Sequence, residues 1–311
     1  MSALICGSFA YDNIMVFRDR FRNHILPDKI HNLNVAFNVD DLRREFGGCA
    51  GNIAYTLRLL GGDPLPMGTV GSDFAPYAER MDRFGIPRTH IKVVEAAYTA
   101  QAYITTDMDD NQITAFHPGA MYHSHEVSVS DAQGVSLGIV SPDGRQGMID
   151  HAAQLAGAGI RFIFDPGQAI PLFDGPDLLS FVEQATWMTV NDYESHMVQE
   201  KTGRSLTDLL GHLEAIVVTR GKEGSRIHTR SRTLEIPVAD TARVVDPTGC
   251  GDAYRSGLLY GLEKGLDWET CGRIAALAGA YNVEQAGTQN HHFDCAGFSD
   301  RLQSTFGIRL D

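Results

Sequence analysis

The sequence contains no long apolar run and few cysteines, and these absences exclude several classes of protein. No stretch approaches the about 20 consecutive apolar residues that a transmembrane helix needs. The first basic residue is Arg18, so the start of the chain lacks the positively charged region of a secretory signal peptide. The five cysteines are dispersed without a C-x-x-C spacing, which favours a reducing compartment over a disulfide framework. We therefore expect a cytoplasmic protein with no membrane partner.

Positive charge is also scarce, because 26 Lys and Arg residues oppose 39 Asp and Glu residues and the net charge at pH 7 is −13. This balance makes a polyanionic nucleic acid an unfavourable partner. The chain has neither the G-x-x-x-x-G-K-[ST] string of a P-loop nor a Rossmann G-x-G-x-x-G after its first apolar run. The twelve histidines have no carboxylates or cysteines at a recognised ligand spacing, so we expect no histidine-based metal site.

The most informative part of the chain is residues 244–260, VVDPTGCGDAYRSGLLY. An Asp-Pro turn is followed by Gly249 and Gly251, which flank Cys250 and precede a pattern typical of a helix. Glycines let the backbone approach a ligand closely, and the first amides of a helix lack intrahelical partners. We therefore expect the amides of these three residues to bind a phosphate or oxyanion, with the Asp252 carboxylate beside them. Taken alone, an acid in a first helical turn can simply complement the helix dipole.

The complete string at residues 246–252, Asp-x-Thr-Gly-x-Gly-Asp, resembles the signature of the PfkB (ribokinase-like) family of small-molecule kinases. The commonest form of that signature has Ala where this chain has Cys250. The change has little consequence if, as in the family, the backbone N–H makes the contact. The resemblance covers nearly the whole chain, and it implies a phosphotransferase that uses ATP and Mg²⁺. It leaves open whether a monovalent cation such as K⁺ is required.

The resemblance also implies where the acceptor binds. The apolar run 4–10 is typical of a buried first strand, and Asp12 follows it where the family has an Asp that binds sugar hydroxyls. Spacing alone leaves a turn-capping role for this Asp open. A second family signature places a Gly-Gly hinge before an Asn that touches the sugar. The implied acceptor site comprises Asp12, Gly47, Gly48 and Asn52. Gln168 could hydrogen-bond a base edge if it reaches the pocket, and Phe116 could either stack a base or pack in the core or lid.

The predicted ATP side rests on two short motifs. Asn191 and Glu194 match the Asn-x-x-Glu motif that organises Mg²⁺ through waters in the family, although the same pattern is common at helix starts. Residues 219–224 resemble the T-x-G-x-x-G segment where the phosphates and ribose of ATP lie, and an ordinary solvated role for the lysine there stays open. The implied ATP-binding residues are Asn191, Thr219, Gly221, Lys222, Gly224 and Asn282, with Gln289 as a weaker match near the adenine.

The order of apolar runs indicates the fold class. From about residue 135 onward, apolar runs alternate with turn signals and helical patterns, which predicts a parallel sheet with helices on both faces. Such sheets bind ligands beyond the carboxyl ends of their strands. The expected strands lie at 135–140, 160–164, 187–190 and 215–219, and the expected helices lie near 144–156 and 269–283, the latter being the last.

Two polar insertions, at about 13–46 and 96–118, contain alternating segments at 33–39 and 99–106 that are typical of strands with one covered face. We expect the insertions to pair into a small sheet, which in ribokinase-like proteins is the lid over the acceptor. The expected fold is therefore a ribokinase-like α/β three-layer sandwich with a mainly parallel central sheet and a small β-sheet lid. The whole chain, 1–311, would form one catalytic domain, either monomeric or dimeric through the lid.

Phosphoryl transfer to an alcohol needs a base near the hydroxyl, cations on the phosphates and donors that absorb charge. Asp252 is the predicted base, in a role typically worth about 10²–10⁴-fold. The strings at 10–12 and 165–168 look like those of prokaryotic adenosine or nucleoside kinases. We therefore expect transfer to the 5′-hydroxyl of a ribonucleoside such as adenosine, inosine, guanosine or cytidine. A free-sugar kinase is the alternative, and a non-catalytic nucleoside sensor is the second.

Overall fold

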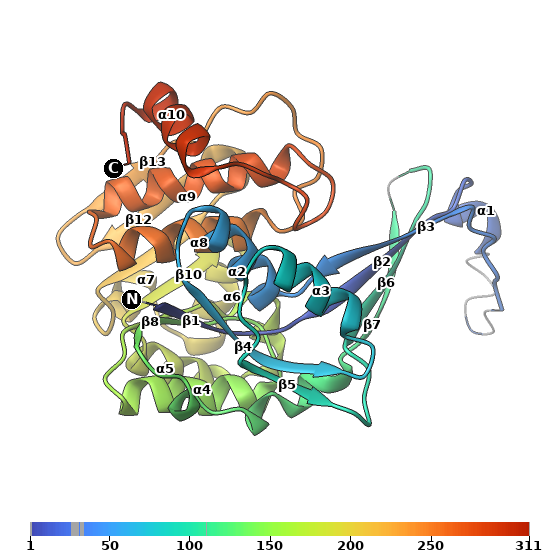
Figure 1. The fold of residues 1–311 in the computed structure, drawn as a ribbon, viewed down its shortest axis with the longest axis horizontal. Coiled ribbons are helices and arrows are strands. Elements are labelled where there is room, and N and C mark those ends of the chain that lie inside the picture. The colour runs from blue at the N-terminus through green and yellow to red at the C-terminus, as the bar shows by residue number, and fades with distance from the viewer. Residues whose placement is uncertain (1, 26–30, 32–33, 110, 311) are drawn as a thin grey trace.

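Figure 1 shows the fold as a computed structural model that describes residues 2–25, 31, 34–109 and 111–310. A nine-stranded sheet has the order β13-β12-β11-β10-β9-β8-β1-β4-β5. It is parallel from β5 to β11, and β12 and β13 add an antiparallel edge. Its strands are β1 (Ser2–Cys6), β4 (Pro64–Gly71), β5 (His90–Val94), β8 (Val135–Val140), β9 (Phe162–Phe164), β10 (Trp187–Asn191), β11 (Ala215–Thr219), β12 (Ser225–Thr229) and β13 (Thr233–Ile236).

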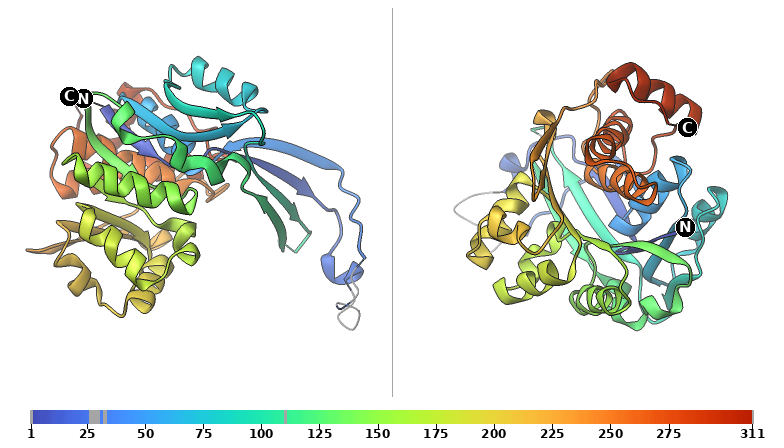
Figure 2. Two further views of the ribbon diagram at one scale, coloured as in Figure 1. Left: turned by 90° about the horizontal axis from the view of Figure 1, so that it is seen from below. Right: turned by 90° about the vertical axis from the view of Figure 1, so that its left-hand side faces the viewer.

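Helices cover both faces of this sheet, which confirms the predicted three-layer architecture (Figure 2). One group is α2 (Cys49–Leu59), α8 (Cys250–Glu263), α9 (Trp268–Val283) and α10 (Cys295–Phe306). The opposite group is α4 (Arg145–Gly157), α5 (Gly175–Gln184), α6 (Asp192–Thr202) and α7 (Leu206–Leu210). The remaining helical segments are α1 (Phe21–His24), α3 (Ala75–Arg83) and the 3₁₀ turns η2 (Gly119–Glu126), η3 (Val129–Asp131), η4 (Gly167–Leu172) and η5 (Gly221–Glu223).

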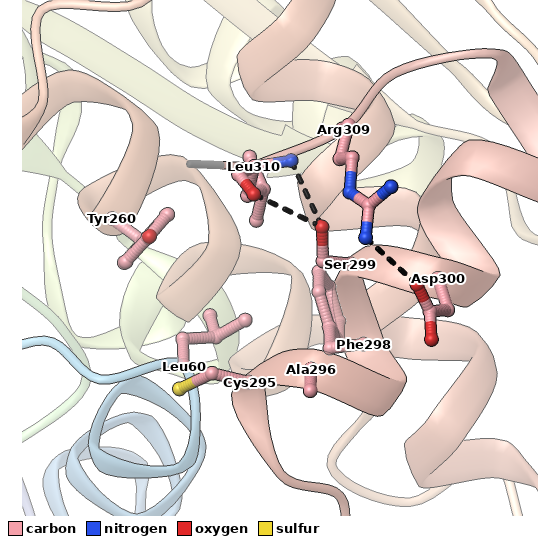
Figure 3. A pocket seen from close by; sticks show the side chains of 9 residues that line it. All are labelled: Leu60, Tyr260, Cys295, Ala296, Phe298, Ser299, Asp300, Arg309 and Leu310. Atoms are coloured by element: carbon pink, nitrogen blue, oxygen red, sulfur yellow. Dashed lines mark hydrogen bonds and ion pairs between the residues drawn. The ribbon is translucent and has the colours of Figure 1, made fainter.

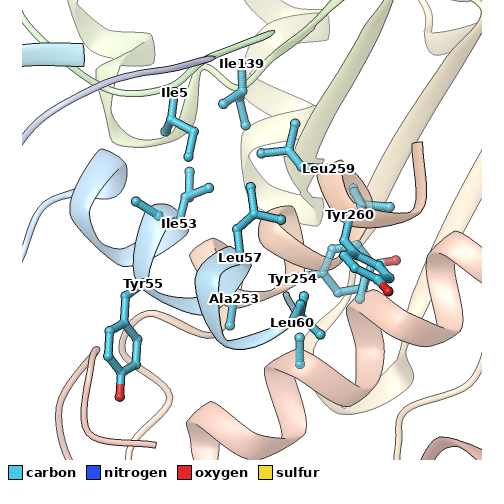
Figure 4. Close-up of a cluster of buried hydrophobic side chains, with 14 of the residues drawn as sticks. Ile5, Ile53, Tyr55, Leu57, Leu60, Ile139, Ala253, Tyr254, Leu259 and Tyr260 are labelled. Atoms are coloured by element: carbon cyan, nitrogen blue, oxygen red, sulfur yellow. The ribbon is translucent and has the colours of Figure 1, made fainter. Parts of the chain in front are cut away.

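Each central strand supplies both cores because neighbouring side chains point to opposite faces of the sheet. Ile5 and Ile139 pack toward α2 and α8, and Figure 4 shows Ile53, Leu57 and Leu259 around them. Leu4 and Val140 lie one residue away and belong to the core on the other face. Full burial of one such side chain contributes about 1.5–3 kcal/mol. Burial on both faces explains why these strands read as continuous apolar runs instead of alternating ones.

A second sheet, the small sheet, has the order β3-β2-β6-β7 and extends away from the core (Figure 1). Its strands are β2 (Ala10–Val16), β3 (Asp41–Gly47), β6 (Ala100–Thr106) and β7 (Gln112–His117). β2 pairs parallel with β6 and antiparallel with β3, so Ala10 lies opposite both Ala100 and Gly47. The two predicted insertions therefore do pair into one sheet.

Three local predictions were wrong. The strand expected at 33–39 is not found: residues 34–39 form no strand, and residue 33 lies outside the described residues. The strand that pairs with β2 is β3, which begins at Asp41. The apolar run 4–10 is divided, because β1 ends at Cys6 and β2 begins at Ala10. Asp12 consequently lies within the small sheet and not directly after the first core strand. Helix α9 is not the last helix, because α10 follows it. Asp294 caps α10 by accepting the Gly297 N–H.

None of the helices in the described ranges has both the length and the apolar character that a membrane crossing requires.

Gly257 sets the distance between α8 and α9. A Cβ at this position would lie 2.5 Å from Ala275 Cα and 2.7 Å from its backbone nitrogen, so the helices touch through backbone atoms. The close contact fixes α8 and therefore the position of its first turn.

We predict that Gly257→Ala lowers the free energy of unfolding by about 1–3 kcal/mol, because α8 and α9 must separate. This loss exceeds the about 1 kcal/mol of helix propensity that alanine gains. Urea denaturation measures the change. The control is Gly157→Ala in α4, where a Cβ meets no atom within 4 Å; it should leave stability unchanged or raise it by up to about 1 kcal/mol. Equal effects at both positions would contradict the packing argument.

Candidate active site

A cavity of about 790 Å³ opens at the start of α8, beyond the carboxyl ends of β9, β10 and β11. This is the edge of the sheet at which parallel α/β folds bind ligands. The predicted residues that line it are Asp252, Gly249, Cys250, Gly251, Gln168, Asn191, Glu194, Thr219, Gly221, Lys222 and Gly224.

The turn before α8 is held by Asp246. Its Oδ1 accepts the Thr248 N–H at 2.9 Å, and its Oδ2 accepts the Gly287 N–H at 3.0 Å. Gly249 is the N-cap residue with φ 82°, a left-handed conformation that favours glycine. The chain therefore enters the helix through a fixed turn that orients the first amides of α8.

The set of free amides at the start of α8 differs from the predicted set by one residue. The Cys250 N–H donates to the Pro247 carbonyl at 3.2 Å, so it belongs to the turn. Within the described chain, the amides of Gly249, Gly251 and Asp252 donate to no backbone or side-chain acceptor. These three N–H groups, with the positive end of the helix dipole, form an anion pocket. The Cys250 thiol lies on the other side, with Sγ 3.7 Å from the Gly279 carbonyl.

Asp252 lies in the first turn of α8 and faces the cavity. Asn52, on α2, donates from Nδ2 to Asp252 Oδ2 at 2.8 Å. Burial raises the pKa of the Asp252 carboxyl, against the lowering effects of the Arg255 charge and the Asn52 hydrogen bond. The arrangement presents a carboxylate with increased basicity beside an anion pocket.

Arg255 is a buried cation that the sequence reading missed. It lies one turn after Asp252, is 8% exposed, and pairs with Asp165 at the end of β9 through Nε and through Nη2 at 2.6 Å. Its Nη2 is also 4.0 Å from Glu194 Oε2. The surrounding carboxylates raise the pKa of Arg255 further above its usual range, so it stays charged. The sequence signal that could have identified Arg255 is its position one helical turn after Asp252.

Asn191 and Glu194 form a capping box at the start of α6. Asn191 Oδ1 accepts the Glu194 N–H and Glu194 Oε2 accepts the Asn191 N–H, each at 2.7 Å. The motif therefore starts a helix and lines the cavity at once. In the described part of the chain, no group of three or more His, Cys, Asp or Glu side chains is arranged to hold a metal directly.

The residues predicted to bind the acceptor, Asp12, Gly47, Gly48 and Asn52, lie at the junction of β2, β3 and α2 and do not line this cavity. A Cβ on Gly47 would lie 2.5 Å from Asp12 Oδ2, and Gly48 has φ 87°, so both positions require glycine. Burial, and next the negative charge of Asp252, raise the pKa of Asp12 to about 6. The carboxyl groups of Asp12 and Asp252 are thus close enough to interact, although Asp12 lies on β2 of the small sheet and Asp252 lies on α8.

The predicted base-contacting residues lie in different surroundings. Gln168 is exposed at the cavity, with Nε2 3.7 Å from Cys49 Sγ. Phe116 lies on β7 of the small sheet, is 52% exposed and does not line the cavity. The position of Phe116 therefore does not support the prediction that it stacks on a base.

The distal part of the cavity is formed by a tight turn and an apolar wall. Gly221 and Gly224, with φ 54° and 79°, bound η5, and Lys222 between them is exposed at the cavity. The apolar wall, which the sequence reading missed, includes Val238, Val244, Ala276, Ala280 and Val283.

Asn282 does not line this cavity, contrary to its predicted role. Its side chain is fully buried, and Nδ2 donates to the Thr288 carbonyl at 3.1 Å and lies 3.4 Å from His291 Nδ1. It points away because this face of α9 packs against the segment that follows the helix. In this structure, Asn282 fixes that segment.

A smaller cavity of about 300 Å³ lies beside α10 and the end of the chain (Figure 3). Its charged lining is the ion pair of Arg309 and Asp300, 3.6 Å apart, and both side chains are more than 70% exposed. Its lining has no buried carboxylate, whereas Asp165, Glu194 and Asp252 line the larger cavity beside the buried Arg255, so the larger one is the candidate active site.

We predict that Arg255→Met lowers the free energy of unfolding by about 3–5 kcal/mol, because it leaves a buried carboxylate unpaired. The control is Arg226→Met, which removes an exposed pair with Glu235 and should change stability by about 0–1 kcal/mol. Chemical denaturation at pH 7 measures both. A loss at Arg255 no larger than at Arg226 would show that the buried carboxylates do not depend on this cation.

Comparison with known proteins agrees with this geometry. The model of the pfkB family carbohydrate kinases matches residues 11–293. A nucleoside kinase of Methanocaldococcus jannaschii is 31% identical over 266 residues, which are 85% of this chain and 87% of that protein. The structure of Burkholderia thailandensis nucleoside kinase in complex with inosine is 52% identical, covers 99% of each chain and has a TM-score of 0.90. Its complex with ADP-inosine is likewise 52% identical, covers 99% of this chain and 97% of that one, and has a TM-score of 0.88. The chain belongs to the PfkB family of carbohydrate kinases and has its ribokinase-like fold.

Proposed function

We propose that this protein is an ATP-dependent ribonucleoside kinase that phosphorylates the 5′-hydroxyl of its acceptor. The observation that carries the proposal is the position of Asp252, between the free amides of α8 and the acceptor-side groups Asn52 and Asp12. The relatives support a nucleoside acceptor, since the Burkholderia protein has been solved with inosine and with ADP-inosine.

The residues of the cavity suit ATP. The free amides of Gly249, Gly251 and Asp252 would receive the terminal phosphate oxygens. Lys222 and the η5 turn lie farther along and would contact the remaining phosphates and the ribose. The apolar wall formed by the segment 238–244 and by α9 has the character that an adenine ring needs.

The carboxylates suit Mg²⁺ held through water. Glu194 Oε2 is engaged by the Asn191 N–H, which leaves Oε1 for a water ligand. Mg²⁺ keeps several waters and few protein ligands, so one carboxylate beside the phosphates is a suitable complement. When bound, the ion would neutralise charge on the phosphates.

In the proposed reaction, Asp252 accepts the proton of the acceptor hydroxyl as the hydroxyl oxygen attacks the γ-phosphorus, and the bond from the γ-phosphorus to the β,γ-bridging oxygen breaks to release ADP. The Asn52 hydrogen bond holds one oxygen of the carboxylate and leaves the other to receive the proton. The amides at the start of α8 stabilise the charge that develops on the transferring group. Asp12 would accept hydrogen bonds from the ribose hydroxyls and so orient the acceptor. The small sheet, formed by residues 10–16, 41–47, 100–106 and 112–117, would act as a lid that excludes water.

A panel of nucleosides and free sugars tests the function. Adenosine, inosine, guanosine, cytidine, ribose and fructose are each incubated with the protein, ATP and Mg²⁺, and ADP formation is measured. We expect turnover with at least one nucleoside and a far lower kcat/KM for the sugars. A preference for ribose or fructose would support the free-sugar kinase instead, and no turnover with any acceptor would support a sensor.

We predict that Asp252→Asn lowers kcat by about 10²–10⁴-fold with little change in the KM for ATP, because the amide cannot accept the proton. Initial rates of ADP formation give both constants. The matched control is Asp300→Asn on α10, an exposed carboxylate remote from the cavity, which should leave kcat unchanged. Retained turnover in the Asp252 variant would remove the residue from the role of base.

Activity should depend on the ionisation of Asp12, whose pKa is about 6. Below this pH the carboxyl is protonated and loses its capacity to accept two hydroxyl hydrogen bonds, so kcat/KM for the nucleoside should fall by up to about tenfold per pH unit. In Asp12→Asn, the acid limb near pH 6 should be lost, because the variant has no carboxyl to titrate at this position. Rate profiles from pH 5 to 8 would show this. An acid limb that keeps its position in the variant would contradict its assignment to Asp12.

A further inference from the structure

We propose that Gln289 is a positioning residue, which orients the base Asp252 through Asn52 by a hydrogen-bond relay that begins at Arg80. The proposal rests on the proposed function, because it assigns Asp252 the role of base. The sequence reading placed Gln289 near the adenine, but the structure places its side chain on the acceptor side, 3% exposed and in contact with α2 and α3.

The relay consists of three successive hydrogen bonds. Arg80 Nε donates to Gln289 Oε1 at 3.4 Å, and Gln289 Nε2 donates to Asn52 Oδ1 at 3.0 Å. Asn52 Nδ2 then donates to Asp252 Oδ2 at 2.8 Å. The four residues come from α3, the segment after α9, α2 and α8, so the fold brings them together across more than 200 positions of sequence.

The two ends of the relay determine its direction. The guanidinium of Arg80 can only donate, and an ionised carboxylate can only accept. Between them, Gln289 must present Oε1 to Arg80 and Nε2 to Asn52. Asn52 must then present Oδ1 to Gln289 and Nδ2 to Asp252. The reverse orientation of either amide would oppose two donors or two acceptors in a buried site, which is unfavourable.

The donor end is held rigidly. The Arg80 guanidinium lies 5.1 Å from the ring centroid of Phe46, 5.3 Å from that of Tyr55 and 5.2 Å from that of Phe84, so cation–π contacts surround it. It also donates from Nη2 to the Gln289 backbone carbonyl. Because Phe46 belongs to β3, the anchor includes the strand that connects the small sheet to the core.

Tyr77 adds a second fixed point. Its hydroxyl accepts from Gln289 Nε2 at 2.7 Å and donates to the Gly47 carbonyl at 2.8 Å. A Cβ on Gly51 would lie 1.8 Å from this hydroxyl, so Gly51 is the residue that admits the ring. Gln289 thus has acceptors for its amide nitrogen on two elements, and its amide plane is determined by three partners.

Two near-isosteric substitutions separate positioning from structural support. In Gln289→Glu, the carboxylate still accepts from Arg80, the Tyr77 hydroxyl must turn from the Gly47 carbonyl to donate to it, and the carboxylate also attracts Asn52 Nδ2. The Asn52 amide would therefore turn and present its oxygen to Asp252. Gln289→Met removes the hydrogen bonds but imposes no orientation on Asn52.

We expect Gln289→Glu to lower kcat by about 10–100-fold, the effect of losing one hydrogen bond to a charged group. Gln289→Met should lower kcat by about 3–10-fold. The KM for ATP should stay within about twofold in both, because the nucleotide cavity is not altered. The urea midpoint should fall in both variants, because each leaves Asn52 Oδ1 without a donor, so the difference in kcat is the readout that separates them. Gln303→Glu, on the exposed face of α10, is the control and should change neither kcat nor midpoint.

The relay is tested by steady-state kinetics with the best nucleoside from the panel and by urea denaturation. An active wild type whose Glu variant turns over as fast as the Met variant or faster would overturn the relay alone. A Glu variant that fails to fold would also overturn it, since Arg80 and Tyr77 would then not support a carboxylate at this position. A wild type without turnover on any acceptor would overturn the proposed function and the relay together.

Discussion

The unpaired amides at the start of α8, together with the carboxylate of Asp252 in the same turn, are the arrangement on which the rest of the structure depends. Amide donors at a helix start attract an anion, whereas a carboxylate beside them repels it, so the two can coexist only if each is held in a fixed place. Asp246 fixes the amides through Thr248 and Gly287, and Asn52 fixes the carboxylate. Close packing of α8 on α9 at Gly257 then fixes the position of α8 relative to the core.

Charge balance is the second constraint on the site. Asp165, Glu194 and Asp252 line the cavity, Asp12 lies close enough to feel the charge of Asp252, and Arg255 is the buried cation that pairs with Asp165. A cluster with this excess of negative charge suits a site that binds Mg²⁺ with a nucleotide, because the metal supplies the missing positive charge. The same cluster explains how a protein of net charge −13 can have a phosphate site: the free amides and local cations act at short range, where total charge matters little.

Much of the architecture could be predicted from the sequence because it depends on local patterns. The core strands β8, β10 and β11 were predicted from short apolar runs, and α8 from the glycines that precede it. Boundaries were less certain where a strand changes sheet. The run 4–10 has Ser8 as its one polar side chain, yet the chain leaves the core sheet after Cys6 and joins the small sheet at Ala10. The strand β3 was misplaced because most of its side chains are charged and exposed, so its pattern is weak.

The sequence by itself determined the chemistry of the site, since the glycines at 249 and 251, Asp252 and the Gly47-Gly48 hinge are recognisable as strings of neighbouring residues. Only the tertiary structure decided which distant side chains complete it. Arg255 acquires its partner from β9, Gln289 reaches Asn52 and not the nucleotide cavity, and Asn282 turns into the core. The physical reason is that a motif specifies backbone conformation over a few residues, whereas burial and pairing of a charge or an amide depend on helices and strands that meet only in the folded chain.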